Sequence, residues 1–299
     1  MPTYIVVLKS SGGSETVIGN FDAEDDQDSL VKLPQNIPGQ YNGLQHAITC
    51  QRCEIDALKY YPRMARPQLG FDSYINMPGL GPLFKMEENA QRPLPHDAVA
   101  MSASLNQLTI LVRNLEDIFR SVEPSLANLQ VYGHLIRNTL LLAAMEFENE
   151  CKGVLRANGY VPGSNNARWT TVDFVKVLAP LRLREYAVDL AFYPAIPRRN
   201  PFHNWNAQAP TQSLSWYDAY NAVKHDREHE FHRATLEAAI DAVTACAIML
   251  AAQYRLIWNW KDQVGGFFNF VESPNWLPTQ RYVFRRGFGR WNAVSFDFQ

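Results

Sequence analysis

Between residues 96 and 262 the apolar positions recur every three or four residues, the spacing that lines one face of an α-helix. The predicted helices run from about residue 96 to before residue 124, and over about 125–158, 172–178, 181–191 and 213–260. Short connections between such helices favour antiparallel neighbours. We therefore expect a mainly α fold, an antiparallel helical bundle with a small terminal β element.

The last predicted helix has the clearest apolar row, and this row changes character towards its start. Its second half consists of Leu236, Ile240, Val243, Ala247 and Leu250. Continued backwards at the same spacing, the row reaches His232, His229 and His225. One face of a single helix is thus expected to change from core residues to imidazoles.

The two ends of the chain carry β patterns. Residues 3–10, followed by Gly12-Gly13 and residues 15–21, are typical of a hairpin. A helix is expected over 41–61, and prolines and glycines then predict an irregular wrapping segment up to residue 95. We therefore divide the chain into a β-hairpin start with an irregular segment (1–95), a helical bundle (96–262) and an aromatic, basic C-terminal β-hairpin (263–299).

Length and composition place the protein in an ordinary globular class. A chain of 299 residues buries a sizeable core, and the net charge of −2 and four cysteines indicate neither a strongly charged class nor a disulfide framework. The start lacks a basic lead, and the longest apolar run, 242–252, is shorter than the roughly 20 residues of a membrane span. We expect a soluble, cytoplasmic protein that does not enter a membrane. Phosphate-loop, nucleophile-elbow and EF-hand motifs are absent, so no cofactor is expected.

The strongest candidate for chemistry is the stretch Asn221-Ala-Val-Lys-His225. An amide and an imidazole four residues apart lie on one helix face, where the imidazole can transfer protons and the amide can orient a substrate. Lys224 and Arg227 supply positive charge for an anionic ligand. We interpret His225 as an acid/base, Asn221 as orienting, and Lys224 or Arg227 as phosphate-binding.

This stretch resembles the motif of the HEPN superfamily (higher eukaryotes and prokaryotes nucleotide-binding), in which an Arg, commonly followed by Asn, precedes a His on a bundle helix. The spacing from Asn221 to His225 matches, and the Glu-rich residues 145–155 are similar to an earlier helix of that bundle. The resemblance covers about residues 131–254. It implies metal-independent RNA cleavage across a homodimer interface. Tyr220 stands where the motif Arg is expected, which leaves catalysis open.

The C-terminal segment offers a second surface for nucleic acid. Basic residues interleave there with aromatic ones; the basic residues are Arg281, Arg285, Arg286 and Arg290. Arginines that follow the backbone and rings that stack on bases suit single-stranded RNA. A half-buried edge hairpin has the same pattern.

Three functions therefore remain open. The first is an RNA-binding or metal-independent RNA-cleaving protein, in a defence or toxin setting. The second is a non-catalytic helical interaction or ligand-sensing module, in which the histidines form a buried polar seam. The third is a zinc hydrolase, since His225-Asp-Arg-Glu228-His229 matches the His-x-x-Glu-His pattern and His232 adds a third imidazole.

Overall fold

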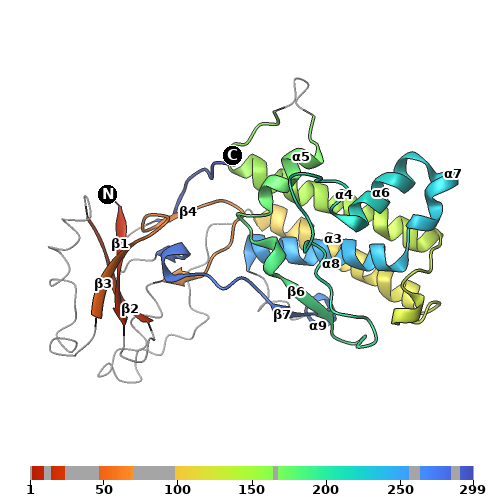
Figure 1. Cartoon of the computed structure of the whole chain (residues 1–299), viewed down its shortest axis with the longest axis horizontal. Helices are drawn as coiled ribbons and strands as arrows, with labels where there is room; N and C mark the ends of the chain where they lie inside the picture. The colour runs from red at the N-terminus through yellow and green to blue at the C-terminus, as the bar shows by residue number, and fades with distance from the viewer. Residues whose placement is uncertain are drawn as a thin grey trace. The chain divides into compact units, whose positions relative to one another are not determined.

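The computed structural model describes residues 2–9, 15–23, 47–69, 98–163, 168–255, 263–283 and 290–298 (Figure 1). The chain forms two compact units that alternate along the sequence. The first comprises Met1–Tyr61, Arg66–Pro95 and Asn275–Val294. The second comprises Pro62–Ala65, His96–Pro274 and Ser295–Gln299. The chain therefore passes from one unit to the other several times.

The first unit begins with a three-stranded antiparallel sheet. Strand β1 (Thr3–Lys9) lies between β2 (Glu15–Asp22) and β3 (Ala47–Arg52). The N-terminal hairpin is thus confirmed, whereas the helix expected over 41–61 is wrong for the residues described there. Strand β3 contains the β-branched residues Ile48 and Thr49, which are common in strands. It pairs with the edge of β1 that β2 leaves open.

The described C-terminal strands of this unit pair with segments far away in the sequence. Strand β4 (Lys59–Tyr60) is parallel to β9 (Asn292–Ala293), and β5 (Gln68–Leu69) is parallel to β8 (Tyr282–Val283). A short 3-10 helix, Pro278–Gln280, precedes β8. The predicted C-terminal hairpin is therefore not what these strands form, because each one pairs with the earlier half of the unit.

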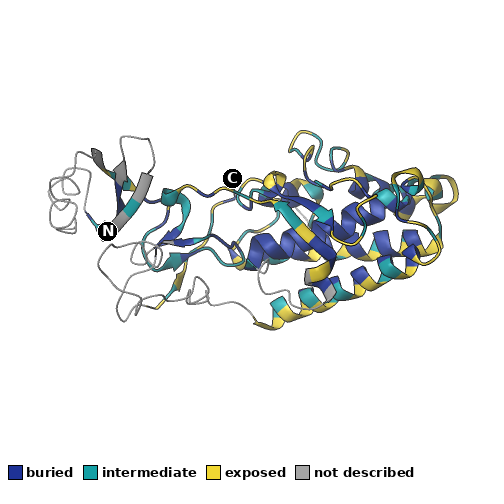
Figure 2. Cartoon of the chain, turned by 90° about the horizontal axis from the view of Figure 1, so that it is seen from below, coloured by how far each residue is buried: buried dark blue, intermediate teal, exposed yellow. Residues whose placement is uncertain are grey.

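The second unit is built on four helices: α3 (Ala98–Phe119), α4 (His134–Ala157), α6 (Ser215–His225) and α8 (Leu236–Tyr254). Helix α8 is buried on every side, and α3, α4 and α6 each pack against it. In Figure 2 the buried residues follow the inner faces of the helices and the exposed residues follow their outer faces. Helix thus predominates in the regular structure that is described, as the sequence predicts.

Short elements join the main helices. Several are helical: the 3-10 turn Leu126–Asn128, α5 (Thr171–Phe174) with the 3-10 turn Val175–Val177, the 3-10 turn Leu183–Glu185, and α9 (Gln263–Phe267). Strand β6 (Ala187–Leu190) pairs antiparallel with β7 (Phe268–Glu272). The helix predicted over 181–191 is therefore wrong, because this range contains a 3-10 turn followed by the strand Ala187–Leu190. Apolar content alone does not distinguish a short buried strand from a helix. The small strands give the protein a mixed α/β character.

By length and composition α8 could also cross a membrane. In the structure, however, 94% of its most apolar window is buried inside the protein. No second helix of this kind occurs among the described residues. Burial of this extent is what the central helix of a packed core requires.

The segment Pro62–Ala65 ties α4 to α8. The Ala65 amide donates to the carbonyl of Ala252 at 2.9 Å, and the Arg63 guanidinium donates to Glu150 Oε2 at 2.8 Å and Gln253 Oε1 at 2.6 Å. Glu150 is buried, so this charge needs the arginine as a partner. The segment therefore fixes the spacing of the two helices that support the candidate site.

Candidate functional site

The long helix predicted over 213–260 is interrupted between residues 225 and 236. Helix α6 ends at His225, and the short helix α7 (Arg227–Glu230) and the 3-10 turn Phe231–Arg233 precede α8. Asp226 caps α7 by accepting a hydrogen bond from the His229 amide at 3.1 Å, and Thr235 caps α8 in the same way. Asp and Thr are strong N-cap residues, so two new helix starts replace one continuous helix.

The interruption separates the three histidines. His225, His229 and His232 are all exposed. His229 Nδ1 lies 2.9 Å from a carboxylate oxygen of Asp226. The hydrogen bond from the His229 backbone amide, and then the one from its side chain, lower the pKa of Asp226. His232 Nδ1 lies 3.2 Å from the carbonyl oxygen of His229. The predicted buried polar seam is therefore wrong.

The zinc alternative loses its geometric basis for the same reason. The pattern from His225 to His229 spans the end of α6 and the start of α7, so its imidazoles do not share a helix face. Within the part of the chain that is described, no group of three or more His, Cys, Asp or Glu side chains could hold a metal ion. Glu228 and His232 are thus not brought together with His225 as a ligand set.

The pair Asn221 and His225 keeps the predicted arrangement. Both residues belong to α6, and their spacing of four places them on one helix face. Asn221 is half-buried and His225 is exposed, so this face is open to a ligand. Arg227, by contrast, lies beyond the helix break on α7 and is not part of the α6 face.

Next to this face, α4 and α6 are joined by a polar cluster centred on Glu148. Glu148 Oε1 accepts hydrogen bonds from the hydroxyls of Tyr217 at 2.8 Å and Tyr220 at 3.2 Å. Glu148 Oε2 accepts from Lys152 Nζ at 3.1 Å. The Tyr220 hydroxyl in turn accepts from Lys224 Nζ at 2.9 Å. The cluster therefore fixes one lysine on each helix.

The ionisation of these groups follows from their surroundings. Burial, and then the charge of Glu148, raise the pKa of Tyr217, so its hydroxyl stays protonated. Burial is also the largest cause of the raised pKa of Tyr220. The hydrogen bond to Tyr220 raises the pKa of Lys224, whose ammonium therefore stays charged at neutral pH.

Positive charge exceeds negative charge in this cluster. Lys152 donates directly to the single carboxylate of Glu148, whereas Lys224 reaches this carboxylate through the Tyr220 hydroxyl, and the charge of exposed Arg168 also acts on Lys224. On the opposite side of the α6 face, Arg233 is paired with the carboxylates of Asp218 at 2.5 Å and Glu230 at 3.4 Å. The charge of Arg233 is therefore already compensated, and Lys224 on α6 is better placed than Arg233 to bind an anion.

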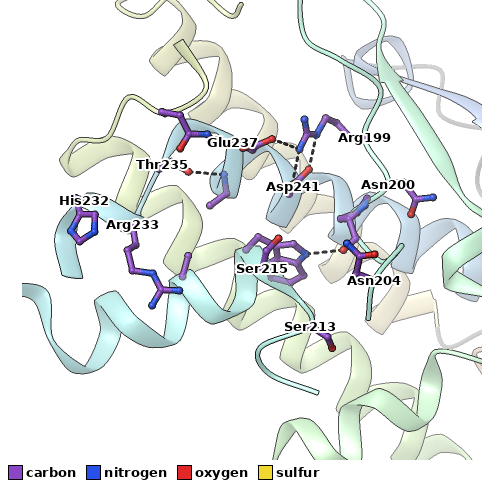
Figure 3. A pocket seen from close by; sticks show the side chains of 15 residues that line it. Arg199, Asn200, Asn204, Ser213, Ser215, His232, Arg233, Thr235, Glu237 and Asp241 are labelled. Carbon is purple, nitrogen blue, oxygen red and sulfur yellow. Dashed lines mark hydrogen bonds and ion pairs between the residues drawn. The ribbon is translucent and has the colours of Figure 1, made fainter. Parts of the chain in front are cut away.

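A polar cavity of about 510 Å³ lies beside α6 and the 3-10 turn after α7, and its lining includes Trp216, Ala219 and His232 (Figure 3). Arg199 lines it and is held by both oxygens of Asp241, at 2.7 and 2.8 Å, and by Glu237 at 3.0 Å. The other arginine of the lining, Arg233, forms the two ion pairs with Asp218 and Glu230 described above. Because each of these arginines is already paired with two carboxylates, the cavity is a poor site for phosphate.

The predicted basic surface at the C-terminus is only partly described. Arg281 is half-buried and donates from Nε to the carbonyl oxygen of Trp276 at 3.2 Å, a structural contact. Arg290 is exposed. Arg285 and Arg286 lie outside the described residues, so the interleaved pattern as a whole stays a prediction.

Sequence reasoning missed the role of Tyr217, Tyr220 and Glu148. A signal was present, because residues 217, 220 and 224 have the spacing of one helix face, and Glu148 and Lys152 are four residues apart. The pairing of those two faces depends on how α4 packs against α6, which periodicity does not contain. Compared with known protein families, curated proteins and solved structures, this chain shows no match.

Proposed function

We propose that this protein binds RNA on the exposed face of α6 and cleaves it without a metal ion. The observation that carries the proposal is the pair Asn221 and His225 on one open helix face, beside the positively charged cluster around Lys224. An anionic backbone is attracted by the lysine, while an imidazole on the same surface can exchange protons with it.

In such a reaction the ribose 2′-oxygen attacks the adjacent phosphorus and loses its proton, and the 5′-oxygen leaves and gains one. His225 would act as the acid/base for one of these transfers. Asn221 would orient the phosphate or the ring, and Lys224 would compensate the charge that builds up on the phosphoryl oxygens. Products would be a 2′,3′-cyclic phosphate and a 5′-hydroxyl, with no net consumption of water.

The proposal includes a HEPN-like antiparallel bundle and a homodimer in the cytoplasm, as the motif resemblance implies. A row of exposed apolar residues on α4 supports self-association, because such a row is costly in water. Its members are Leu135, Leu142 and Met145, with 64%, 41% and 55% of their surface exposed. The last member of this row, Met145, lies one turn before Glu148, so a second copy seated on the row would approach the site.

The test is degradation of a labelled single-stranded RNA by the purified protein. His225→Ala should lower the cleavage rate about 100-fold or more, the range of general acid–base catalysis. His203→Ala is the matched control, since His203 is also exposed but precedes α6. EDTA should leave the rate unchanged. Equal rates for the wild type and His225→Ala would overturn cleavage at this site.

Binding without cleavage is the second candidate function. The observation in its favour is Tyr220, which stands at the position of the motif arginine. Its hydroxyl donates a hydrogen bond to Glu148 and accepts one from Lys224. RNA that binds the wild type with salt-dependent affinity but stays intact would establish this version.

A further inference from the structure

The direction of each hydrogen bond around Tyr220 follows from the chemistry of its neighbours. The Glu148 carboxylate can only accept, so Tyr220 must donate its single hydroxyl proton to it. The Tyr220 oxygen is then left as an acceptor, and the Lys224 ammonium is its donor. The two hydrogen bonds, from Lys224 to Tyr220 and from Tyr220 to Glu148, therefore donate in the same direction.

Within the described part of the chain, Lys224 therefore keeps hydrogen-bond donors that no acceptor uses. An ammonium has three donors, and Tyr220 takes one of them. The ammonium also lies 4.9 Å from the centroid of the Tyr220 ring, so its position is fixed by the oxygen and the ring together. Lys224 is otherwise an exposed side chain at the end of α6. A free lysine would lose several rotamers on binding, and this one is already partly ordered.

We infer that Lys224 is the cation of an oxyanion subsite that takes one phosphate of the ligand, and that Tyr220 is its positioning residue. The identification of the phosphate with an RNA phosphodiester rests on the proposed function; the subsite itself does not. A tyrosine at the position expected for an arginine thus supplies positive charge indirectly, through the lysine one turn further along α6.

The alternatives to Lys224 are weaker on the same grounds. Arg227 lies on α7, beyond the end of α6. Arg233 is compensated by two carboxylates. Lys152 shares Glu148 directly, so its ion pair opposes binding of another anion. Lys224 reaches Glu148 only through the neutral Tyr220 hydroxyl, which leaves more of its charge for a ligand.

Tyr217 provides a matched control. It is the same residue type, lies on the same helix and donates to the same oxygen of Glu148. Its hydroxyl lacks the contact with Lys224 that Tyr220 makes. Tyr217→Phe and Tyr220→Phe therefore each remove one hydrogen bond to Glu148, but only Tyr220→Phe releases the lysine.

The experiment is a titration of the full-length protein with inorganic phosphate, followed by NMR of the lysine side chains. Lys224→Ala should abolish the response. Tyr220→Phe should weaken phosphate binding about fivefold, as expected for loss of one hydrogen-bonded positioning contact, and should lower the pKa of Lys224. Tyr217→Phe should change the phosphate affinity less than twofold. It should shift the pKa of Lys224 by a correspondingly small amount.

Equal effects of Tyr217→Phe and Tyr220→Phe would overturn the positioning role, and unchanged phosphate binding by Lys224→Ala would overturn the subsite. If a variant does not fold, the wild type alone decides: phosphate must shift the Lys224 signal and leave that of Lys176, which lies on another element, unchanged. Phosphate binding without any RNA binding would refute the proposed function while supporting the subsite.

Discussion

The guanidinium of Arg63 lies over Gly153 of α4, in the space that a β-carbon on residue 153 would occupy. This is the reason for a glycine in the middle of a helix, where alanine is ordinarily more stable by about 1 kcal/mol. The close approach lets Arg63 reach Glu150 and Gln253 at the same time. The missing side chain at Gly153 thus makes room for the side chain of Arg63, which lies 90 residues earlier in the sequence.

Gly153→Ala should therefore destabilise the protein in spite of the better helix propensity of alanine. The methyl group displaces the guanidinium, and Glu150 then loses the cation that compensates its buried charge. We expect a net loss of about 1–3 kcal/mol in the free energy of unfolding, measured by urea denaturation.

A double-mutant cycle separates this effect from helix propensity. In the background of Arg63→Ala the space over residue 153 is empty, so Gly153→Ala should there be neutral or stabilising by up to about 1 kcal/mol. The same destabilisation in both backgrounds would show that Arg63 is not the cause.

The parts of the fold that the sequence predicted are those with long periodic patterns. The apolar run of β1 with the hairpin pattern after it, and the apolar row from Leu236 to Leu250, each extend over many residues, and the structure contains the elements they predict. The helix break was missed because the histidines continue the apolar spacing by coincidence. Asp226 and Thr235 were the local signal for it, since each caps the helix that follows.

Other features could not be obtained from a single sequence. Strands β4 and β9 contain two residues each, too few for a pattern, and they join positions 59 and 292. The Asn221 and His225 pair was found because both residues belong to one helix. The bond between Tyr217 and Glu148 was not, because it depends on which faces of α6 and α4 meet.

Glu146 should make stability depend on pH. Burial, followed by the nearby charge of Glu150, raises the pKa of Glu146 from 4.5 to about 7, although the positive charge of Arg63 opposes this. The folded state therefore binds a proton between these values that the unfolded state has released. The stabilisation from this proton is complete below pH 4.5, declines as the pH rises through this window, and is lost above pH 7.

Glu146→Gln should remove this dependence, because an amide carries no charge at either pH. The measurement is urea unfolding of both proteins at pH 5 and pH 8, which bracket most of the window. The difference in stability between Glu146→Gln and the wild type should shift in favour of the variant at the higher pH. A difference that is the same at both values would show that Glu146 titrates normally in the folded protein.

Arg199 should contribute far more to stability than its sequence neighbour Arg198. Arg199 is buried, with both of its partners on α8: Asp241, which it binds with two hydrogen bonds, and Glu237. Arg198 is half exposed and pairs with Asp189 and Glu272.

Arg199→Ala should lower the free energy of unfolding by about 3–5 kcal/mol, since Asp241 would remain buried without its cation. Arg198→Ala should cost less than about 1 kcal/mol, as exposed ion pairs do. Urea denaturation of the two variants under identical conditions measures both values, and similar losses would contradict the role assigned to burial.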